Sequence, residues 1–213
     1  DENGKLEPLA RKNIDTGAGL ERISAAMQGV YNNFDSDLFQ PTIKVIEKSF
    51  GIKYGESEKA DVSIKVIADH TRAVTFTVAE GVLPSNEGRG YVLRRVLRRA
   101  LRHGNLLGKK EPFMSEIIDS LVERMEKIYP ELSEKKEFVK KIVKAEEDRF
   151  LQTLEKGIDK LNDITNALSD KIIPGAVAFE LYDTYGFPID ITIEIAQEKG
   201  FKVDEQSFET FMK

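Results

Sequence analysis

Cysteine and tryptophan are absent from this sequence of 213 residues, and histidine occurs only at His70 and His103. Without cysteine, the chain forms no disulfide and offers no thiolate to a metal. Two histidines are a poor supply for a histidine-based zinc site. The sequence therefore predicts no metal site, and no Ser–His–Asp or Cys–His catalytic arrangement can be assembled from it. We interpret His70 as an interior polar residue of a helix rather than a catalyst.

Long hydrophobic runs are also missing. No apolar stretch approaches the roughly 20 residues that span a bilayer, and the first residues contain no signal-peptide hydrophobic region. Hydrophobic residues make up 40% of the chain and charged residues 32%, which is typical of a soluble globular protein long enough to form a core. We therefore expect a cytoplasmic protein with no membrane partner.

The net charge of −5 argues against a nucleic-acid partner, but the distribution of charge argues for one. The segment 88–110 contains eight basic residues and no acidic residue. A basic segment this concentrated in an acidic chain indicates a local surface for a polyanion. The basic residues are Arg89, Arg94, Arg95, Arg98, Arg99, Arg102, Lys109 and Lys110.

Helical periodicity dominates after about residue 30, so the predicted fold class is mainly α. Phe150, Leu154, Ile158 and Leu161 follow one another at helical spacing and predict a long amphipathic helix over 133–168. Further helices are predicted around Phe39 to Phe50 and over about 60–79, 87–106, 113–128 (stopped by Pro130), 176–185 and 189–199. In front of these, Ile14 to Thr16 predicts a short strand, followed by a glycine turn and a helix from Leu20 that Gly29 closes.

The first candidate binding motif is the glycine turn over 15–22. Gly17 and Gly19, just before a helix, would expose backbone N–H groups and let a phosphate approach closely. Arg22, one turn into the helix, would add a fork of donors for the same phosphate. A plain strand-to-helix turn with a solvated arginine explains the same spacing, and the spacing alone favours that alternative.

The second candidate is the arginine helix that begins after Asn86. Arg94, Arg98 and Arg102 form one row along it, Arg95 and Arg99 form the row beside it, and the apolar residues take the opposite face. A polyanion would relieve the repulsion among these like charges and release counterions. Pairing of the arginines with acidic neighbours is the open alternative.

The third candidate is the segment 179–188, which ends a helix near Asp183. A carboxylate at this end of a helix is opposed by the helix dipole. By itself the segment indicates only an exposed aspartate.

Together these stretches resemble the alanyl-tRNA synthetase family, whose members are class II aminoacyl-tRNA synthetases. Several long motifs occur in the family's order, so the match is specific. The resemblance covers almost the whole chain, through the segments 13–29, 33–39, 66–73, 81–104 and 181–188.

The resemblance implies a reaction in which ATP, with Mg²⁺, activates alanine, and the alanyl group then passes to the 3′ end of tRNA(Ala). Residues 1–30 are expected to be the end of the aminoacylation domain, with the family's third signature motif. In that motif Gly17 and Gly19 would line the ATP site, and Arg22, as a catalytic residue, would hold the triphosphate. The earlier signature motifs, the zinc-containing editing domain and the oligomerisation domain are expected to lie outside this chain, which is therefore expected not to form adenylate by itself.

Residues 31–213 are expected to form the helical tRNA-recognition domain, which reads a G·U wobble pair in the acceptor stem. By resemblance, Asp183 accepts a hydrogen bond from the free guanine amino group, and Asn86 supplies an amide beside it. The arginines would grip flanking phosphates, which positions the RNA without specifying its sequence; these are Arg89, Arg94, Arg95, Arg98, Arg99 and Arg102. Arg98→Ala should then weaken G·U and G·C stems about equally. The alternative from another class is a helical interaction module that docks an acidic protein partner through the arginine helix.

Overall fold

Helices form most of the computed structural model, which describes residue 11 and residues 16–212. The chain divides into two compact units, residues 1–40 and 41–213. The strand expected at Ile14 to Thr16 includes two residues outside the described part, and Thr16 itself lies in no strand. The mainly α fold class is confirmed, and the functional division expected at residue 30 stays a prediction.

The first unit contains α1 (Leu20–Gln28) and the short 3-10 helix η1 (Asn33–Asp35). Gly29 ends α1 in the left-handed conformation, with φ of 66°, as the sequence predicted. Two hydrogen bonds join the end of α1 to Asp37: Gln28 Nε2 donates to its carboxylate at 2.7 Å, and Gln28 Oε1 accepts from its backbone N–H at 2.9 Å.

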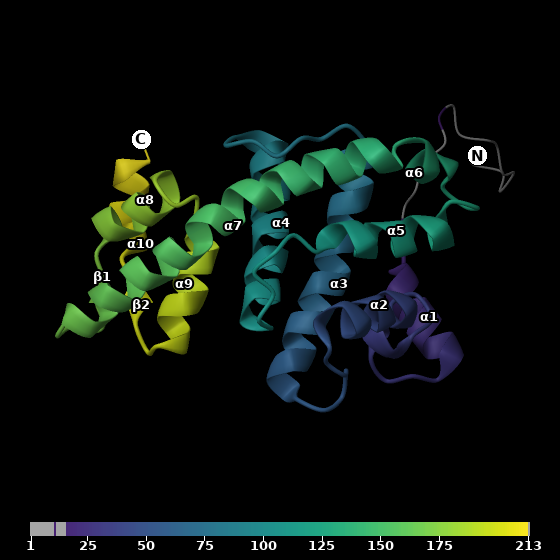
Figure 1. Ribbon diagram of the computed structural model, residues 1–213, viewed down its shortest axis with the longest axis horizontal. Helices are drawn as coiled ribbons and strands as arrows, with labels where there is room; N and C mark the ends of the chain where they lie inside the picture. Colours follow the sequence, from purple (N-terminus) through teal and green to yellow (C-terminus); the bar gives the residue numbers. More distant parts are fainter. Residues whose placement is uncertain (1–10, 12–15, 213) are drawn as a thin grey trace, which may run out of the picture. The chain divides into compact units, whose positions relative to one another are not determined.

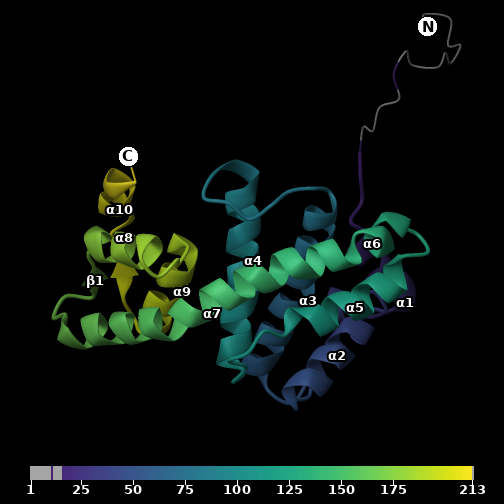
Figure 2. The same cartoon turned by 45° about the horizontal axis from the view of Figure 1, so that its top comes forward.

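The larger unit is built around five consecutive helices and one very short one. They are α2 (Gln40–Phe50), α3 (Glu58–Ala79), α4 (Gly88–Leu106), α5 (Met114–Met125), α6 (Pro130–Glu134) and α7 (Lys136–Ala167). The helices α3, α4, α5 and α7 pack on one another and bury their apolar faces, with Ile67, Leu97, Ile117 and Val143 inaccessible to solvent. Figures 1 and 2 show α7 passing α5 and α4 and continuing to the C-terminal elements.

Two helix boundaries differ from the prediction near Pro130. The helix α5 ends at Met125, and Pro130 does not stop it but occupies the first turn of α6, where its missing N–H costs nothing. The long helix starts at Lys136 rather than near 133, because the helical conformation is interrupted at Lys135. The Nζ of Lys135 donates to the carbonyl of Ala79 at 2.6 Å. Proline therefore marks the start of a helix here.

The C-terminal elements are β1 (Ile172–Ile173), α8 (Gly175–Asp183), α9 (Ile189–Glu198), β2 (Lys202–Val203) and α10 (Glu205–Phe211). The two strands pair in parallel, with Ile172 opposite Lys202. Sequence periodicity does not predict these strands, since a strand of two residues has no alternation to detect. Aromatic rings join α8 to α10, with Phe179 and Phe208 6.4 Å apart and Tyr182 and Phe208 5.8 Å apart between centroids.

A buried carboxylate on α7 holds the start of α5. Glu147 is inaccessible to solvent, and its Oε1 accepts from the N–H groups of Phe113 at 3.0 Å and Met114 at 3.1 Å. These N–H groups lie at a helix N-terminus and have no partner within the helix. Burial raises the pKa of Glu147 to about 7, and the two backbone hydrogen bonds oppose that rise. The fold therefore favours the protonated form of Glu147 below about pH 7.

Glu147→Gln should make the free energy of unfolding less dependent on pH. The pKa of Glu147 is higher in the fold than its ordinary value of 4.5, so the wild type loses stability as pH rises from about 4.5 through 7, by about 3 kcal/mol in total. Glutamine keeps an oxygen for the two N–H groups and carries no charge. The stability of the variant relative to wild type should rise across that window and level off above it, in urea titrations from pH 4 to pH 8.

The variant must be compared with wild type at each pH, because His103 also changes the stability of both proteins in this range. Burial, and then the nearby arginines, lower its pKa to about 4, so its contribution to stability is lost as pH falls from about 6.5 to 4. That loss opposes the Glu147 effect in the overlap of the two windows. A difference between Glu147→Gln and wild type that is the same at every pH would contradict the assignment.

Candidate nucleic-acid interface

A cavity of about 170 Å³ lies between the start of α4 and the end of α8. Asn86 and Asp183, far apart in the sequence, both line it and are both exposed. These are the two residues that the resemblance assigns to reading the G·U pair. Its other lining residues are Tyr91, Arg94, Arg98, Tyr182, Gly186 and Pro188.

The turn that carries Asn86 is held by close backbone packing. The N–H of Ser85 donates to the carbonyl of Gly90 at 3.1 Å, and Ser85 Oγ donates to the carbonyl of Glu87 at 2.9 Å. Gly90 is required at this point, because a Cβ there would lie 2.2 Å from Ser85 Oγ and 2.3 Å from the carbonyl oxygen of Leu83. The segment before α4 therefore folds back on the first turn of the helix and presents Asn86 beside it.

The turn after Asp183 is held by α7. Gly186 has a φ of 70°, which favours glycine, and the next residue, Phe187, is fully buried. The ring of Phe187 lies 5.8 Å from that of Phe150, and Thr153 Oγ1 donates to the carbonyl of Tyr185 at 2.8 Å. The position of Asp183 therefore depends on packing against α7.

The arginines of α4 form ion pairs with carboxylates of α7 and α9. Arg94 and Arg98 both contact Glu146, and Arg95 lies 3.1 Å from Asp190. The remaining pairs are Arg99 with Glu194 at 2.7 Å, Arg102 with Glu194 at 3.1 Å and Arg102 with Glu198 at 2.6 Å. Five arginines thus face four carboxylates, so the arginine helix pairs with acidic neighbours, the alternative that the sequence left open.

The six arginines differ in how accessible their side chains are to a phosphate. The side chain of Arg102 is 3% exposed, so its guanidinium is occupied within the fold. The side chains of Arg95 and Arg99 are 41% and 40% exposed despite their ion pairs. Arg89 is exposed, and the described part of the chain contains no ion pair for it. Three arginines of the predicted set therefore remain open to a ligand.

Sequence reasoning did not find three residues of the site: Glu146, Tyr91 and Tyr182. Tyr91 and Tyr182 both line the cavity, and their rings meet edge-on with centroids 6.5 Å apart. Burial raises the pKa of Tyr91, with a further rise from Asp190. Glu146 did carry a signal, because it lies three residues after Val143 and four before Phe150, on the apolar face of α7. A charged residue on such a face needs a partner of opposite charge.

The candidate ATP residues lie in the first unit, in the motif 15–22, which the structure describes from residue 16 onward. Gly17 and Gly19 are exposed, neither has a positive φ, and a Cβ at Gly17 would meet nothing within 4 Å. Arg22 lies in the first turn of α1 and is exposed. Asp15 lies outside the described residues. The exposed turn before a helix N-terminus leaves room for a phosphate, and the binding role stays a prediction.

Among the described residues, no group of three or more His, Asp and Glu side chains could hold a metal ion. Among the same residues, no helix is long and apolar enough to cross a membrane. His70 is half-buried in α3, with its Nδ1 2.9 Å from the carboxylate of Asp69.

Comparison with known proteins decides the family. The family model for tRNA synthetases class II (A) matches residues 1–213. The chain belongs to this family of class II tRNA synthetases. It is similar to the alanine–tRNA ligases of Fervidobacterium nodosum (61% identical), Thermotoga maritima (58%) and Petrotoga mobilis (57%). Each match covers all of this chain and 24% of the relative, so the chain spans about a quarter of the length of these curated relatives.

Gly157→Ala should destabilise the protein at the turn that carries Asp183. A Cβ on Gly157 of α7 would lie 2.4 Å from Cε2 of Phe187, whose ring is fully buried. Overpacking should lower the free energy of unfolding by about 1–3 kcal/mol. The higher helix propensity of alanine offsets about 1 kcal/mol of that loss. Urea unfolding measures it, with the exposed Lys156→Ala as control. A Gly157→Ala variant more stable than wild type would contradict the close packing.

Proposed function

We propose that the whole protein is an alanine–tRNA ligase that activates alanine with ATP and Mg²⁺ and transfers it to tRNA(Ala). Within it, this chain reads the G·U wobble pair of the acceptor stem through Asn86 and Asp183. One observation carries the proposal: these two residues line the same exposed cavity. The family match and the alanine–tRNA ligase relatives support the reaction.

The chemistry of the two side chains suits a wobble pair. A G·U pair leaves the guanine amino group unpaired in the shallow minor groove of RNA, which side chains can reach. The carboxylate of Asp183 only accepts hydrogen bonds, and the amide of Asn86 can donate as well as accept. Arg94 Nη1 already donates to Asn86 Oδ1. The amide nitrogen of Asn86 is therefore left to donate to an RNA acceptor such as a 2′-hydroxyl.

The exposed arginines provide the sequence-independent part of binding. We assign phosphate contacts to Arg89, Arg95 and Arg99, because their side chains remain accessible. The carboxylates of α7 and α9 neutralise most of the charge of the arginine helix, which lowers its attraction for an acidic protein partner and for phosphates alike. The G·U preference distinguishes the two, because charge attraction alone cannot supply it.

The remaining roles rest on the resemblance. Gly17, Gly19 and Arg22 are proposed to contribute to the ATP site, with Arg22 on the triphosphate. The editing domain with its zinc is proposed for a part of the protein outside these residues. A cytoplasmic location belongs with the proposed role in protein synthesis.

Asp183→Ala should remove the preference for a G·U over a G·C acceptor-stem hairpin. Loss of one well-placed contact to a base edge costs about 1–3 kcal/mol, on the order of ten-fold in affinity or more. Binding of both hairpins at one salt concentration measures the ratio, and Thr184→Ala, exposed at the next position, is the matched control. A ratio unchanged by Asp183→Ala would refute the assignment.

Arg89→Ala should weaken both hairpins by the same factor. Removal of one phosphate contact lowers the slope of log affinity against log salt by about 1. The measurement is a salt titration with each hairpin, with the exposed Lys127→Ala as control. A change in the G·U to G·C ratio, without a general loss of affinity, would show that Arg89 contacts a base instead.

A further inference from the structure

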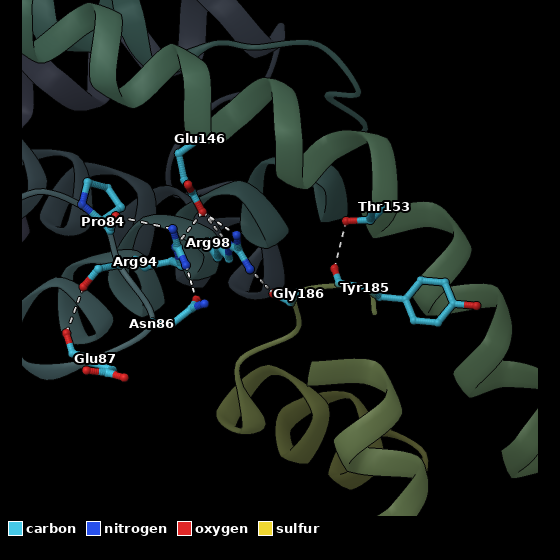
Figure 3. A network of polar contacts seen from close by, with 10 residues as sticks. Pro84, Asn86, Glu87, Arg94, Arg98, Glu146, Thr153, Tyr185 and Gly186 are labelled. Carbon is cyan, nitrogen blue, oxygen red and sulfur yellow. Dashed lines mark hydrogen bonds and ion pairs between the residues drawn. The ribbon is translucent and has the colours of Figure 1, made fainter. Parts of the chain in front are cut away.

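One carboxylate oxygen on α7 connects both sides of the proposed reading site. Glu146 is 3% exposed, and its Oε1 lies 2.8 Å from Nε and 2.5 Å from Nη2 of Arg98, and 3.1 Å from Nε of Arg94. Figure 3 shows the carboxylate between the two guanidinium groups. Neither the resemblance nor the site residues expected from the sequence include Glu146.

The first guanidinium reaches the Asn86 side of the cavity. Arg94 Nη1 donates to Asn86 Oδ1, and Nη2 donates to the carbonyl of Pro84 at 3.3 Å. These contacts fix the turn before α4 and the direction in which the amide of Asn86 points. Arg94 is itself placed by Glu146, since its side chain is 17% exposed and its Nε faces the carboxylate.

The second guanidinium reaches the Asp183 side. Arg98 Nη1 donates to the carbonyl of Gly186, three residues after Asp183. A Cβ on Gly186 would collide with the same guanidinium group, so only glycine permits this approach. Arg98 also lies over the ring of Phe150, with its Cζ 5.1 Å from the ring centroid.

The charge balance at this point requires the carboxylate. Two guanidinium groups lie beside one buried oxygen, and without it their like charges would repel each other at low solvent exposure. Burial lowers the pKa of Arg98, and Glu146 opposes that effect. Loss of Glu146 would therefore move both arginines toward solvent and release both turns together.

We propose that Glu146 is a positioning residue that sets the separation and orientation of Asn86 and Asp183, and through them the discrimination of G·U from G·C, without touching RNA. The inference rests on the proposed function of that pair. It also changes the expectation for Arg98: because Arg98 holds the Asp183 turn, Arg98→Ala should lower G·U binding more than G·C binding, rather than both equally.

The test compares two neighbouring buried glutamates. Glu146→Met removes the carboxylate and keeps an unbranched side chain, and Glu146→Gln keeps an oxygen without its charge. We expect the ratio of G·U to G·C affinity to fall on the order of ten-fold with methionine and roughly five-fold with glutamine. Glu147→Gln, a buried carboxylate of the same helix that contacts neither arginine, is the control and should keep the wild-type ratio.

Unfolding transitions of each variant establish that it is folded. If Glu146→Met does not fold, the glutamine variant decides. A folded Glu146 variant with the wild-type ratio would overturn the inference, as would an equal loss in Glu147→Gln.

A second measurement needs no RNA. The chain has no cysteine, so Glu87→Cys and Thr184→Cys place nitroxide labels at exposed positions next to Asn86 and Asp183. Electron paramagnetic resonance should give a broader distance distribution when Glu146→Met is added, and an unchanged one with Glu147→Gln. An unchanged distribution with Glu146→Met would overturn the positioning role. If wild type itself shows no G·U preference, the proposed function fails, and the label distances still test the positioning.

Discussion

The cavity at the start of α4 depends on a buried cluster of one negative and two positive charges. In it, the carboxylate of Glu146 lies between the guanidinium groups of Arg94 and Arg98. Each guanidinium also donates hydrogen bonds to oxygens of a different turn, one before α4 and one after α8. The turn before α4 is also held by the packing of Ser85 on Gly90 in the first turn of that helix. The link between the two turns comes from α7, a helix that supplies none of the residues lining the cavity.

The helix α7 carries out two such tasks with adjacent residues. Glu146 turns toward α4 and pairs with its arginines, and Glu147 turns toward α5 and accepts from its first N–H groups. Further along, Phe150, Thr153 and Gly157 hold the Tyr185–Phe187 turn through a ring contact, a hydrogen bond and close packing. One long helix thus holds the segments that form the cavity walls.

Sequence periodicity predicted the helices well, because their apolar faces repeat over many turns. The arginine helix is found close to its expected bounds, with Leu97 and Leu101 fully buried on the face opposite Arg95 and Arg99. The partners of the arginines could not be predicted, since Glu146, Asp190 and Glu194 lie far along the chain and reach α4 only in the tertiary fold. Local pattern gave Asp183 no role, and the resemblance alone singled it out. The burial of Arg102 against Glu194 and Glu198 of α9 could not be predicted either, because it is not visible in a helical row.

The central claim is that Glu146 acts on discrimination only through the residues that it positions. A double-mutant cycle between Glu146→Met and Asp183→Ala, read as the ratio of G·U to G·C hairpin affinity, tests this directly. If the account is right, Glu146→Met causes no further loss of the ratio once Asp183 has been removed. Two losses that add independently would contradict it.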